Sequence, residues 1–512
     1  MDWRRTAGLS LLVFGLAGTA VAAEKAALAD AVEQRNAALL RKLLDEGADV
    51  NAAQVDGMTA LHWAVYNDDA ASARMLVRAG AKVNAVNRYG VPPLSLACTN
   101  ANADMVKLLL EAGADAKAAL PGGETVLMTA ARAGNLETVK ALLGRGADPN
   151  ARERSDQTAI MWAAAEGHAP VVKALIDAGA DIRAKVKSGF TPLFFGVREG
   201  QIEVARTLLA AGVDVNETFQ GDRLARKGLA KGISPLLMAV ENGHFELAIV
   251  LVDAGADPND QRSGFAPLHT MSWVRKPDVS DSGDPPPIGS GRLTSLQFVR
   301  ALVERGARVN EPLDGSVLHP PNSLTLVGTE GATPLLMAAD RADAPLMRLL
   351  LTLGANPHLP NAEGTTPLMA AAGLGTANPL EEAGTEAEAL EAVQLLLDRG
   401  ADINAVDYNG DTAMHGAAEG GFPTVVQLLA ERGADPNIWN RPNFEESTPL
   451  FIAEGYRRGR PQPTPLALDA LRRIMVAKGL PTDGARPTRR DTYERERADR
   501  ERENRTQKAQ KP

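Results

Sequence analysis

Cysteine is almost absent from this chain, since Cys98 is the single one among its 512 residues. An internal disulfide needs a second cysteine and is therefore excluded, as is a Cys-x-x-Cys metal or redox site. The chain also lacks a Gly-x-Gly-x-x-Gly motif after a strand, a phosphate-binding loop motif, a His-Glu-x-x-His zinc motif and a Gly-x-Ser-x-Gly nucleophile motif. We therefore expect no catalytic residue, no cofactor and no metal site.

Aromatic residues and excess positive charge are also scarce. Phe, Trp and Tyr make up 4% of the chain, and 55 Lys and Arg stand against 64 Asp and Glu, for a net charge of −9. A negative chain is a poor general binder of nucleic acid, because such binding rests on cations that neutralise phosphates. A low aromatic content and abundant alanine are typical of closely packed helix pairs, because small side chains let the helices approach each other.

Long apolar runs are missing near the N-terminus, where Leu9–Ala20 is too short to span a bilayer. This stretch follows two arginines and ends in Ala-Val-Ala, a pattern typical of a secretory signal with its cleavage site. We expect a signal peptide over residues 1–23, cleaved after Ala22 or Ala23. The sequence thus predicts an exported protein of the periplasm, without a transmembrane segment in the mature chain.

The chain contains one short motif many times, Gly-Ala-Asp-Val-Asn-Ala and its variants, first found at Gly47. We call this repeated motif the phrase. In the first half its leading glycines stand at positions 47, 80, 113, 146, 179 and 212. Each step is 33 residues, and a fixed period of this size indicates stacked copies of one supersecondary unit.

Each copy contains the signals of two helices. A Thr-Pro-Leu-like start, as at Thr191, provides a helix N-cap with proline at the first turn. A helix of small residues follows, and a glycine such as Gly134 marks the bend before the second helix. In Leu136–Leu143 the large apolar residues recur at helical spacing. The phrase's glycine then closes the second helix as a left-handed cap, and Asp and Asn suit the next turn.

The period and the Thr-Pro-Leu-His-like start resemble the ankyrin repeat. The resemblance covers nearly all of the chain after the signal and implies an all-α solenoid of about 12 helix-turn-helix units. Short β-turns, which we call fingers, would join the units. The resemblance implies structural roles for five histidines, namely His62, His269 and His415 at helix starts and His168 and His244 after bends. It also implies a small core position for Cys98.

The period divides the chain into parts. Residues 24–216 contain regular repeats with an N-terminal cap. Residues 217–484 contain repeats with insertions and a C-terminal cap, because the closing glycines there stand at 255, 306, 354, 400, 433 and 479. Residues 485–512 are a charged tail, predicted to be disordered or a solvated helix.

The extra residues of the second half fall in two kinds of place. Residues 217–231 and 311–330 lengthen fingers, whereas residues 272–294, 374–388 and 455–465 lengthen bends between the two helices of one unit. We expect the bend insertions to form one ridge on the edge opposite the fingers. Insertions in repeat proteins are often binding surfaces, but surface loops also tolerate neutral changes in length.

The resemblance implies a protein partner on the concave side, at fingers and exposed positions of first helices. Tyr, Trp and Arg dominate binding hot spots. The candidate binding residues on fingers, first helices and the 272–294 insertion are Tyr66, Tyr89, Arg154, Lys187, Tyr408, Trp439, Trp273 and Arg275. We expect a monomeric, non-enzymatic interaction scaffold or adaptor of the cell envelope.

Two other classes of function stay open at this point. A hydrolase or metal-dependent enzyme could use Ser272 with Asp278, Asp281 and Asp284 on the insertion, and His415 with Glu419 has a spacing that could hold a metal. A structural envelope component without a discrete ligand is the other alternative. Clustered aromatics on the concave face would favour protein binding over that role.

Overall fold

The computed structural model describes residues 26–219, 232–277, 285–314, 325–377, 384–456 and 462–483. These residues form 25 helices and two isolated antiparallel β-bridges, so the prediction of an all-α solenoid is confirmed. The chain divides into two compact units, unit 1 (Met1–Asp214) and unit 2 (Val215–Pro512), and each is described by itself. The predicted signal peptide, the tail and His319 lie outside the described residues.

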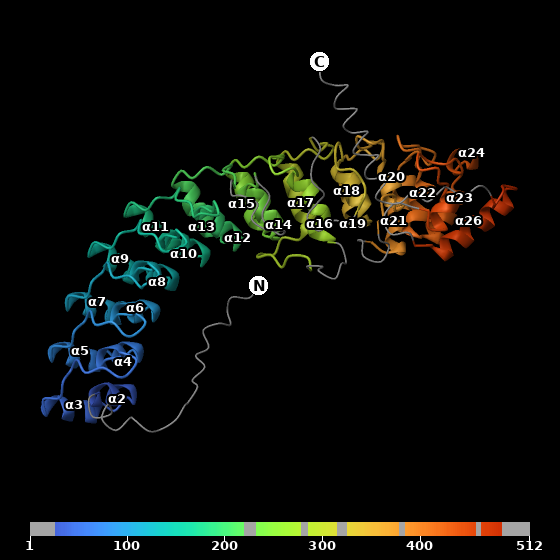
Figure 1. The fold of residues 1–512 in the computed structure, drawn as a ribbon. Coiled ribbons are helices and arrows are strands. Elements are labelled where there is room, and N and C mark those ends of the chain that lie inside the picture. The colour runs from blue at the N-terminus through green and yellow to red at the C-terminus, as the bar shows by residue number, and fades with distance from the viewer. Residues whose placement is uncertain are drawn as a thin grey trace, which may run out of the picture. The chain divides into compact units, whose positions relative to one another are not determined.

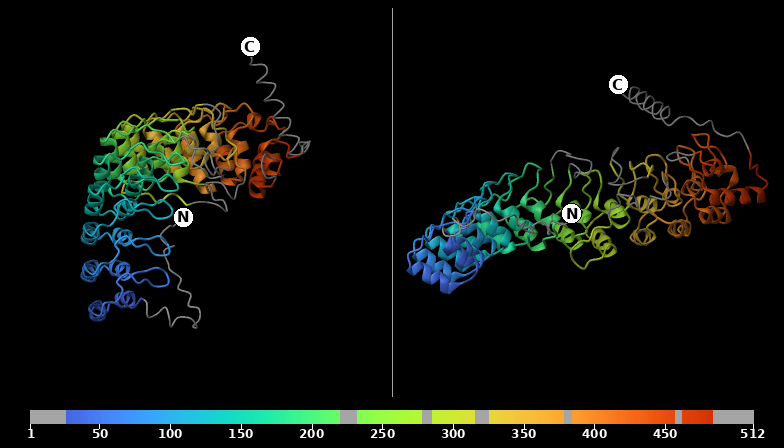
Figure 2. Two further views of the ribbon diagram at one scale, coloured as in Figure 1. Left: turned by 60° about the vertical axis from the view of Figure 1, so that its left-hand side comes forward. Right: turned by 60° about the horizontal axis from the view of Figure 1, so that its bottom comes forward.

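The described part of unit 1 contains six helix pairs, stacked in chain order and coloured blue to green in Figures 1 and 2. We number these pairs as repeats 1 to 6. Their bounds are α2 (Ala27–Glu33) and α3 (Ala37–Asp45), α4 (Ala60–Tyr66) and α5 (Ala70–Arg78), α6 (Pro93–Thr99) and α7 (Ala103–Glu111), α8 (Val126–Ala133) and α9 (Leu136–Gly144), α10 (Ala159–Ala165) and α11 (Ala169–Asp177), and α12 (Pro192–Arg198) and α13 (Ile202–Ala210).

The described part of unit 2 contains repeats 7 to 12 and one additional short helix, α24 (Pro436–Trp439). Their bounds are α14 (Pro235–Glu241) and α15 (Phe245–Asp253), α16 (Pro267–Arg275) and α17 (Ser295–Glu304), α18 (Pro334–Asp340) and α19 (Ala344–Thr352), α20 (Pro367–Ala371) and α21 (Glu386–Leu397), α22 (Ala413–Gly420) and α23 (Pro423–Glu431), and α25 (Pro449–Ala453) and α26 (Pro465–Ala477).

The start of each first helix is held by short-range bonds, as repeat 2 illustrates. Thr59 Oγ1 accepts a hydrogen bond from His62 N at 3.4 Å, and His62 Nδ1 accepts one from Thr59 N at 3.2 Å, which forms a capping box. His62 Nε2 lies 3.0 Å from Val91 O of the next repeat. Burial lowers the pKa of His62, so the neutral ring is a structural link, as the resemblance implies.

Where the repeated phrase contains asparagine, this residue joins one repeat to the next. Asn150 Nδ2 donates to Gly179 O at 2.9 Å, and Asn150 Oδ1 accepts from Asp181 N at 2.7 Å. Gly179 closes the next second helix with a φ of +86°, a conformation that glycine adopts without strain. The same two-bond contact is made by Asn51, Asn84, Asn216, Asn259 and Asn310.

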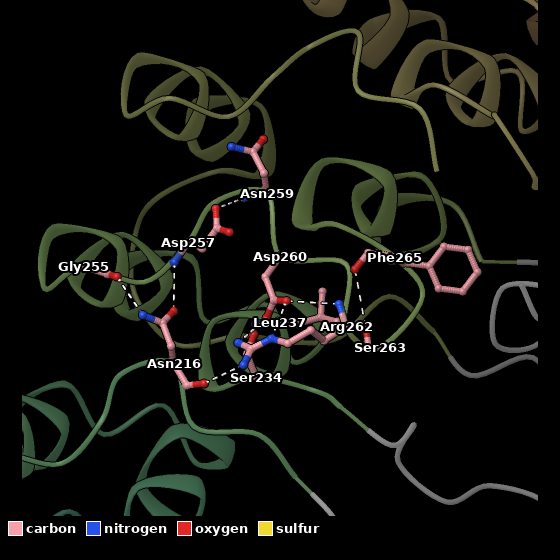
Figure 3. A network of polar contacts seen from close by, with 10 residues as sticks. All are labelled: Asn216, Ser234, Leu237, Gly255, Asp257, Asn259, Asp260, Arg262, Ser263 and Phe265. Atoms are coloured by element: carbon pink, nitrogen blue, oxygen red, sulfur yellow. Dashed lines mark hydrogen bonds and ion pairs between the residues drawn. The ribbon is translucent and has the colours of Figure 1, made fainter. Parts of the chain in front are cut away.

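Figure 3 shows this contact at the start of unit 2, where Asn216 reaches Gly255 and Asp257. Asp257 in turn accepts a hydrogen bond from Asn259 N at 2.9 Å, which fixes the following turn. The repeated aspartates are therefore turn residues, as predicted, and each side chain is used inside the fold.

A second set of bonds joins the bends of neighbouring repeats in unit 1. The N-cap residue of a second helix reaches back to the preceding bend, as when Asn135 Nδ2 donates to Ala101 O at 2.6 Å. His168 Nε2 lies 3.0 Å from Arg132 O, and Gln201 Nε2 donates to Ala165 O at 3.1 Å. Repeats 4 and 5, for example, are thus bonded to each other at both ends of their helices.

Small and branched apolar residues fill the space between the helix rows. First helices pack against first helices along unit 1, and second helices against second helices. The alanines of the first helices are fully buried, for example Ala64, Ala97 and Ala130, because only a methyl group fits between adjacent helices. Cys98 is also fully buried, and burial raises the pKa of its thiol to about 12, so the predicted core position is confirmed.

In unit 2 the described ends of the insertions pack against the preceding bends. Ser290 N donates to His244 Nδ1 at 3.0 Å, and Thr464 Oγ1 donates to Ala418 O at 3.2 Å. Gly384 lies against the backbone of Arg341, at the bend before its own repeat. These insertions therefore make the contacts that single N-cap side chains make in unit 1.

Two predicted insertion bounds are wrong. The first helix α16 continues to Arg275 because Trp273 and Val274 are buried, so the insertion does not begin at residue 272. The helix α21 begins at Glu386, because Thr385 and Glu388 form a capping box there. The insertion in repeat 10 is therefore shorter than the predicted 374–388.

Lys117 stands where the phrase has asparagine, so the two-bond contact to Gly146 O and Asp148 N cannot form there. We expect Lys117→Asn to stabilise unit 1 by about 1 kcal/mol, the typical net worth of a hydrogen-bonded contact. The urea midpoint and the hydrogen exchange of the Asp148 amide would measure this gain. Lys117→Gln is the matched control, because the amide of glutamine is one methylene farther from the backbone than that of asparagine and cannot make both bonds. An equal gain with Gln would refute the explanation.

Candidate protein-binding surface

Two positions of each repeat form the candidate surface. One is the seventh residue after the N-cap of the first helix, and the other is the fingertip, the residue four before that N-cap. We call the surface made by these positions and the side chains between them the first-helix face. In repeats 2 to 6 the seventh positions are Tyr66, Thr99, Arg132, Ala165 and Arg198, and the fingertips are Val55, Arg88, Pro121, Arg154 and Lys187. All of these except Ala165 are exposed.

The first-helix face of unit 1 carries an aromatic pair in repeat 2. The rings of Trp63 and Tyr66 meet edge to face, with centroids 5.5 Å apart. Trp63 is half-buried and donates through Nε1 to Gln54 Oε1 of the finger at 2.6 Å. Tyr66 is 57% exposed, so a large ring with a fixed neighbour is available to a partner.

Farther along the same face, guanidinium groups lie over aromatic rings. The Cζ of Arg132 stands 4.7 Å from the centroid of Trp162 in the next repeat. The Cζ of Arg198 stands 5.5 Å from the centroids of both Phe190 and Phe195. Such stacking holds a guanidinium flat and keeps its N–H edges suited to bidentate acceptors.

The structure supports the exposure of five of the eight predicted residues. Tyr66 and Tyr89 are 57% and 69% exposed in unit 1, and Tyr408 is 82% exposed in unit 2. Arg154 and Lys187 are exposed fingertips of unit 1, and Lys187 Nζ lies 3.9 Å from Asp156 Oδ2. Whether these side chains contact a partner stays a prediction.

Three predicted residues are internal, which corrects the sequence analysis. Trp439 is buried because Asp435 and Pro436 start the short helix α24, which turns the indole inward. Trp273 is buried against Phe265, with ring centroids 4.9 Å apart. Arg275 is bound by an ion pair.

The Arg275 ion pair belongs to the bonds between bends. Its Nε donates to Asp343 Oδ2 at 2.7 Å and its Nη2 to Asp343 Oδ1 at 3.0 Å. Asp343 is fully buried and is the N-cap of α19 in the next repeat. Arg275 therefore holds two repeats together and does not project from an insertion.

One exposed fingertip was not among the predicted residues. Phe444 is 64% exposed and lies beside Tyr408 in the order of fingers, since Phe444 N donates to Asn409 O at 2.6 Å. Counting four residues back from Thr448 identifies this position, whereas Trp439 stands nine residues before it. The exposed position of Phe444 could therefore be predicted from the sequence by this count.

The first-helix face of unit 2 is covered in its middle by residues 325–328, which we call the strap. Thr325 Oγ1 donates to Asp340 Oδ1 at 2.7 Å, and Leu326 N donates to Gly375 O at 2.7 Å. Asn361 Nδ2 of a finger donates to Gly328 O at 2.8 Å. The strap, which is part of the predicted finger insertion 311–330, thus runs from the bend side to the finger side of this face.

Beneath the strap the surface is closed. Glu419, the seventh-position residue of repeat 11, is buried and accepts a hydrogen bond from Gly375 N at 2.7 Å. The cavity left among these residues is about 30 Å³, which is room for about one water molecule. The open part of the described first-helix face in unit 1 is therefore the better candidate for a partner.

The catalytic alternatives gain no support from the described residues. Ser272 is buried and its hydroxyl donates to His269 O, while Asp278, Asp281 and Asp284 lie outside the described residues. His415 Nδ1 accepts from Thr412 N at 3.2 Å, a helix-start contact. No group of three or more His, Cys, Asp or Glu placed to hold a metal ion occurs in the described part of the chain. None of its helices has the length and hydropathy required to cross a membrane.

Three family models for ankyrin repeats match the chain. The model for three copies matches residues 28–120 and 127–219, the single-repeat model matches 231–263 and 330–362, and the model for many copies matches 385–430. Together the matches cover more than half of the chain. They leave out most of the insertions of unit 2.

The chain is similar to several curated proteins over part of its length. The B-cell lymphoma 3 protein homolog of Mus musculus is 30% identical over 37% of this chain and 40% of that protein. The human B-cell lymphoma 3 protein is 36% identical over 35% and 49%, and the transient receptor potential channel pyrexia of Drosophila melanogaster is 33% identical over 24% and 11%. The chain spans less than half the length of these relatives.

Glu241 occupies the seventh position in repeat 7, and burial raises the pKa of its carboxyl to about 7. The folded state therefore binds a proton more tightly than the unfolded state, whose carboxyl has the ordinary value of 4.5. Stability from this group is full below pH 4.5 and is lost as the pH rises to about 7.

We expect Glu241→Gln to raise the free energy of unfolding at pH 8, by at most about 3 kcal/mol, and to change little at pH 4.5. Urea unfolding of both proteins at several pH values would measure the difference. Burial also lowers the pKa of His269 and His415 to about 4. Both histidines are present in the wild type and in the variant, so their contribution to the pH dependence of stability cancels in the difference. A difference that does not grow between pH 4.5 and 7 would contradict the assignment.

Proposed function

Because the chain belongs to the ankyrin-repeat family, we propose that it is a non-enzymatic scaffold or adaptor that binds a protein partner. The binding surface is the first-helix face of unit 1. The mechanism is rigid presentation, since each repeat is bonded to its neighbours and the partner meets a preformed surface. No covalent step is involved.

The observation that carries this proposal is the series of exposed or half-buried aromatics on one face of unit 1. Tyr66 and Tyr89 are exposed, the half-buried Trp63 contacts Tyr66, and the half-buried Trp162 lies against Arg132 in repeat 5. Large rings with fixed neighbours lose little conformational freedom on binding, which is why they dominate interface energies. A purely structural component has no need of such a surface.

We also propose that the chain is exported through its N-terminal signal and works in the cell envelope, in the periplasm. The support is in the sequence, where Arg4 and Arg5 precede an apolar stretch and a small-residue cleavage motif. The buried thiol of Cys98 is compatible with an oxidising compartment, because it is sheltered from solvent.

Export is tested by sequencing the N-terminus of the protein made with its full leader. We expect the mature chain to begin at Ala23 or Glu24 and to be recovered from the periplasmic fraction. Replacing Arg4 and Arg5 by Glu should leave the uncleaved precursor in the cytosol. Recovery of intact Met1 in the wild-type protein would contradict the proposal.

Binding is tested by affinity capture followed by a titration with the purified partner. We expect Tyr66→Ala with Tyr89→Ala to weaken binding at least about 30-fold, because the loss of a single hot-spot ring already costs about 2 kcal/mol. Leu466→Ala is the matched control, since Leu466 is 69% exposed at the far end of unit 2. Equal binding by the double variant would place the site elsewhere, for example at Tyr408 and Phe444.

A further inference from the structure

The strap shows how a chain segment binds a first-helix face in this fold. It crosses the face from bend to finger, with Thr325 Oγ1 and Leu326 N as donors and Gly328 O as an acceptor. Thr325 Oγ1 donates to the seventh-position residue Asp340, and the adjacent Gly375 N donates to the seventh-position residue Glu419. At the seventh positions of unit 2 the face therefore supplies carboxylate acceptors. On the finger side the strap itself is the acceptor, since Gly328 O accepts from Asn361 Nδ2.

The same positions in unit 1 carry the opposite chemistry. Arg132 and Arg198 occupy the seventh position in repeats 4 and 6, and a guanidinium has five donors and no acceptor. Both groups are held over aromatic rings, as described above. A segment crossing this face in the manner of the strap must supply acceptors.

The fingertips of unit 1 make its first-helix face more cationic. Three of the five are cationic, namely Arg88, Arg154 and Lys187, and all are exposed. Among the described residues, no carboxylate oxygen lies within 4.0 Å of the side-chain nitrogens of Arg88 or Arg154. Glu124 Oε1 and Asp156 Oδ2 lie 3.6 and 3.9 Å from Arg132 and Lys187, which is too far for a hydrogen bond. Arg198 is different, because its Nε donates to Glu199 Oε1 at 2.9 Å.

We propose that the first-helix face of unit 1 binds an extended, acidic segment of the partner. Its Asp and Glu side chains contact the guanidinium groups of Arg132 and Arg154, and its apolar side chains contact Tyr66 and Tyr89. The segment crosses the repeats as the strap crosses unit 2. This inference rests on the proposed function and names the chemistry of the partner.

The test uses the full chain and two labelled probes, a random Glu–Tyr copolymer and a random Lys–Tyr copolymer. We expect fluorescence anisotropy to show binding of the Glu–Tyr probe, weakened at least about tenfold between 50 and 300 mM salt because the contacts are exposed and screened. We expect the Lys–Tyr probe to bind at least about tenfold more weakly at low salt. Equal or stronger binding of the Lys–Tyr probe would overturn the inference.

Charge reversal locates the site. Arg132→Glu with Arg154→Glu should weaken Glu–Tyr binding at least about tenfold, as expected when two charge-paired contacts are lost. The matched control is Arg78→Glu with Arg145→Glu, which makes the same change in net charge on exposed second-helix ends of unit 1. An equal loss in both double variants would show a general charge effect and refute the assigned face.

Arg154→Glu alone is the variant least expected to disturb folding, because no hydrogen bond or ion pair among the described residues involves the Arg154 side chain. It should retain the helical circular dichroism of the wild type and still lose several-fold in Glu–Tyr binding. If the Glu–Tyr probe fails to bind while the captured partner still depends on Tyr66 and Tyr89, the acidic segment is wrong and the proposed function stands. If the captured partner is also insensitive to Tyr66 and Tyr89, the proposed function fails as well.

Discussion

The fold depends on one bidentate amide contact, made by the asparagine found four residues after most of the helix-closing glycines. In Asn150 both polar atoms of the side chain are used, one on the carbonyl of Gly179 and one on the amide of Asp181. The contact fixes the distance and direction from one repeat to the next, so the fingers and helix rows keep a constant spacing. Where Lys117 or Arg183 replaces asparagine, the repeat still forms, because the capping bonds at the first helix and the apolar packing remain. Each link is therefore modest, and the array is held by their number.

This arrangement leaves certain positions without a structural task, and function can change there. In unit 1 the seventh residue after the first N-cap is mostly exposed, and it varies from Tyr66 to Arg132. In unit 2 it is Asp340 or Glu419 beside the strap, whereas in repeat 8 it is the buried Trp273. In unit 2 the carboxylates at this position are engaged by the strap and its neighbour Gly375, and the face is closed. The same backbone thus presents an open surface in one unit and a self-occupied one in the other.

The regular features of the fold were predictable because each is caused by residues near in sequence. A threonine N-cap, a glycine with positive φ and an Asx turn act within a few residues, and their recurrence every 33 residues identifies the unit. Arg275 could not be assigned in this way, because its partner Asp343 is 68 residues distant and lies across an insertion. The strap was missed for the same reason, since its contacts join segments that no period relates. The exposed fingertip at Phe444 was predictable by counting from Thr448, whereas the short helix that buries Trp439 interrupts the pattern just before it.

The insertions change the surface without changing the stack, because they reproduce a contact that the regular repeats already make. In unit 1 a single side chain such as Asn135 bonds the preceding bend, and in unit 2 Ser290 bonds His244 at the equivalent place. The chain between two such anchor points can lengthen at small entropic cost, since loop closure depends only weakly on length. Anchoring at both ends therefore allows a repeat array to acquire new loops, and even a strap across its own face, while the asparagine contacts keep the repeats in register. Partner recognition and repeat stacking are in this way encoded by separate sets of residues.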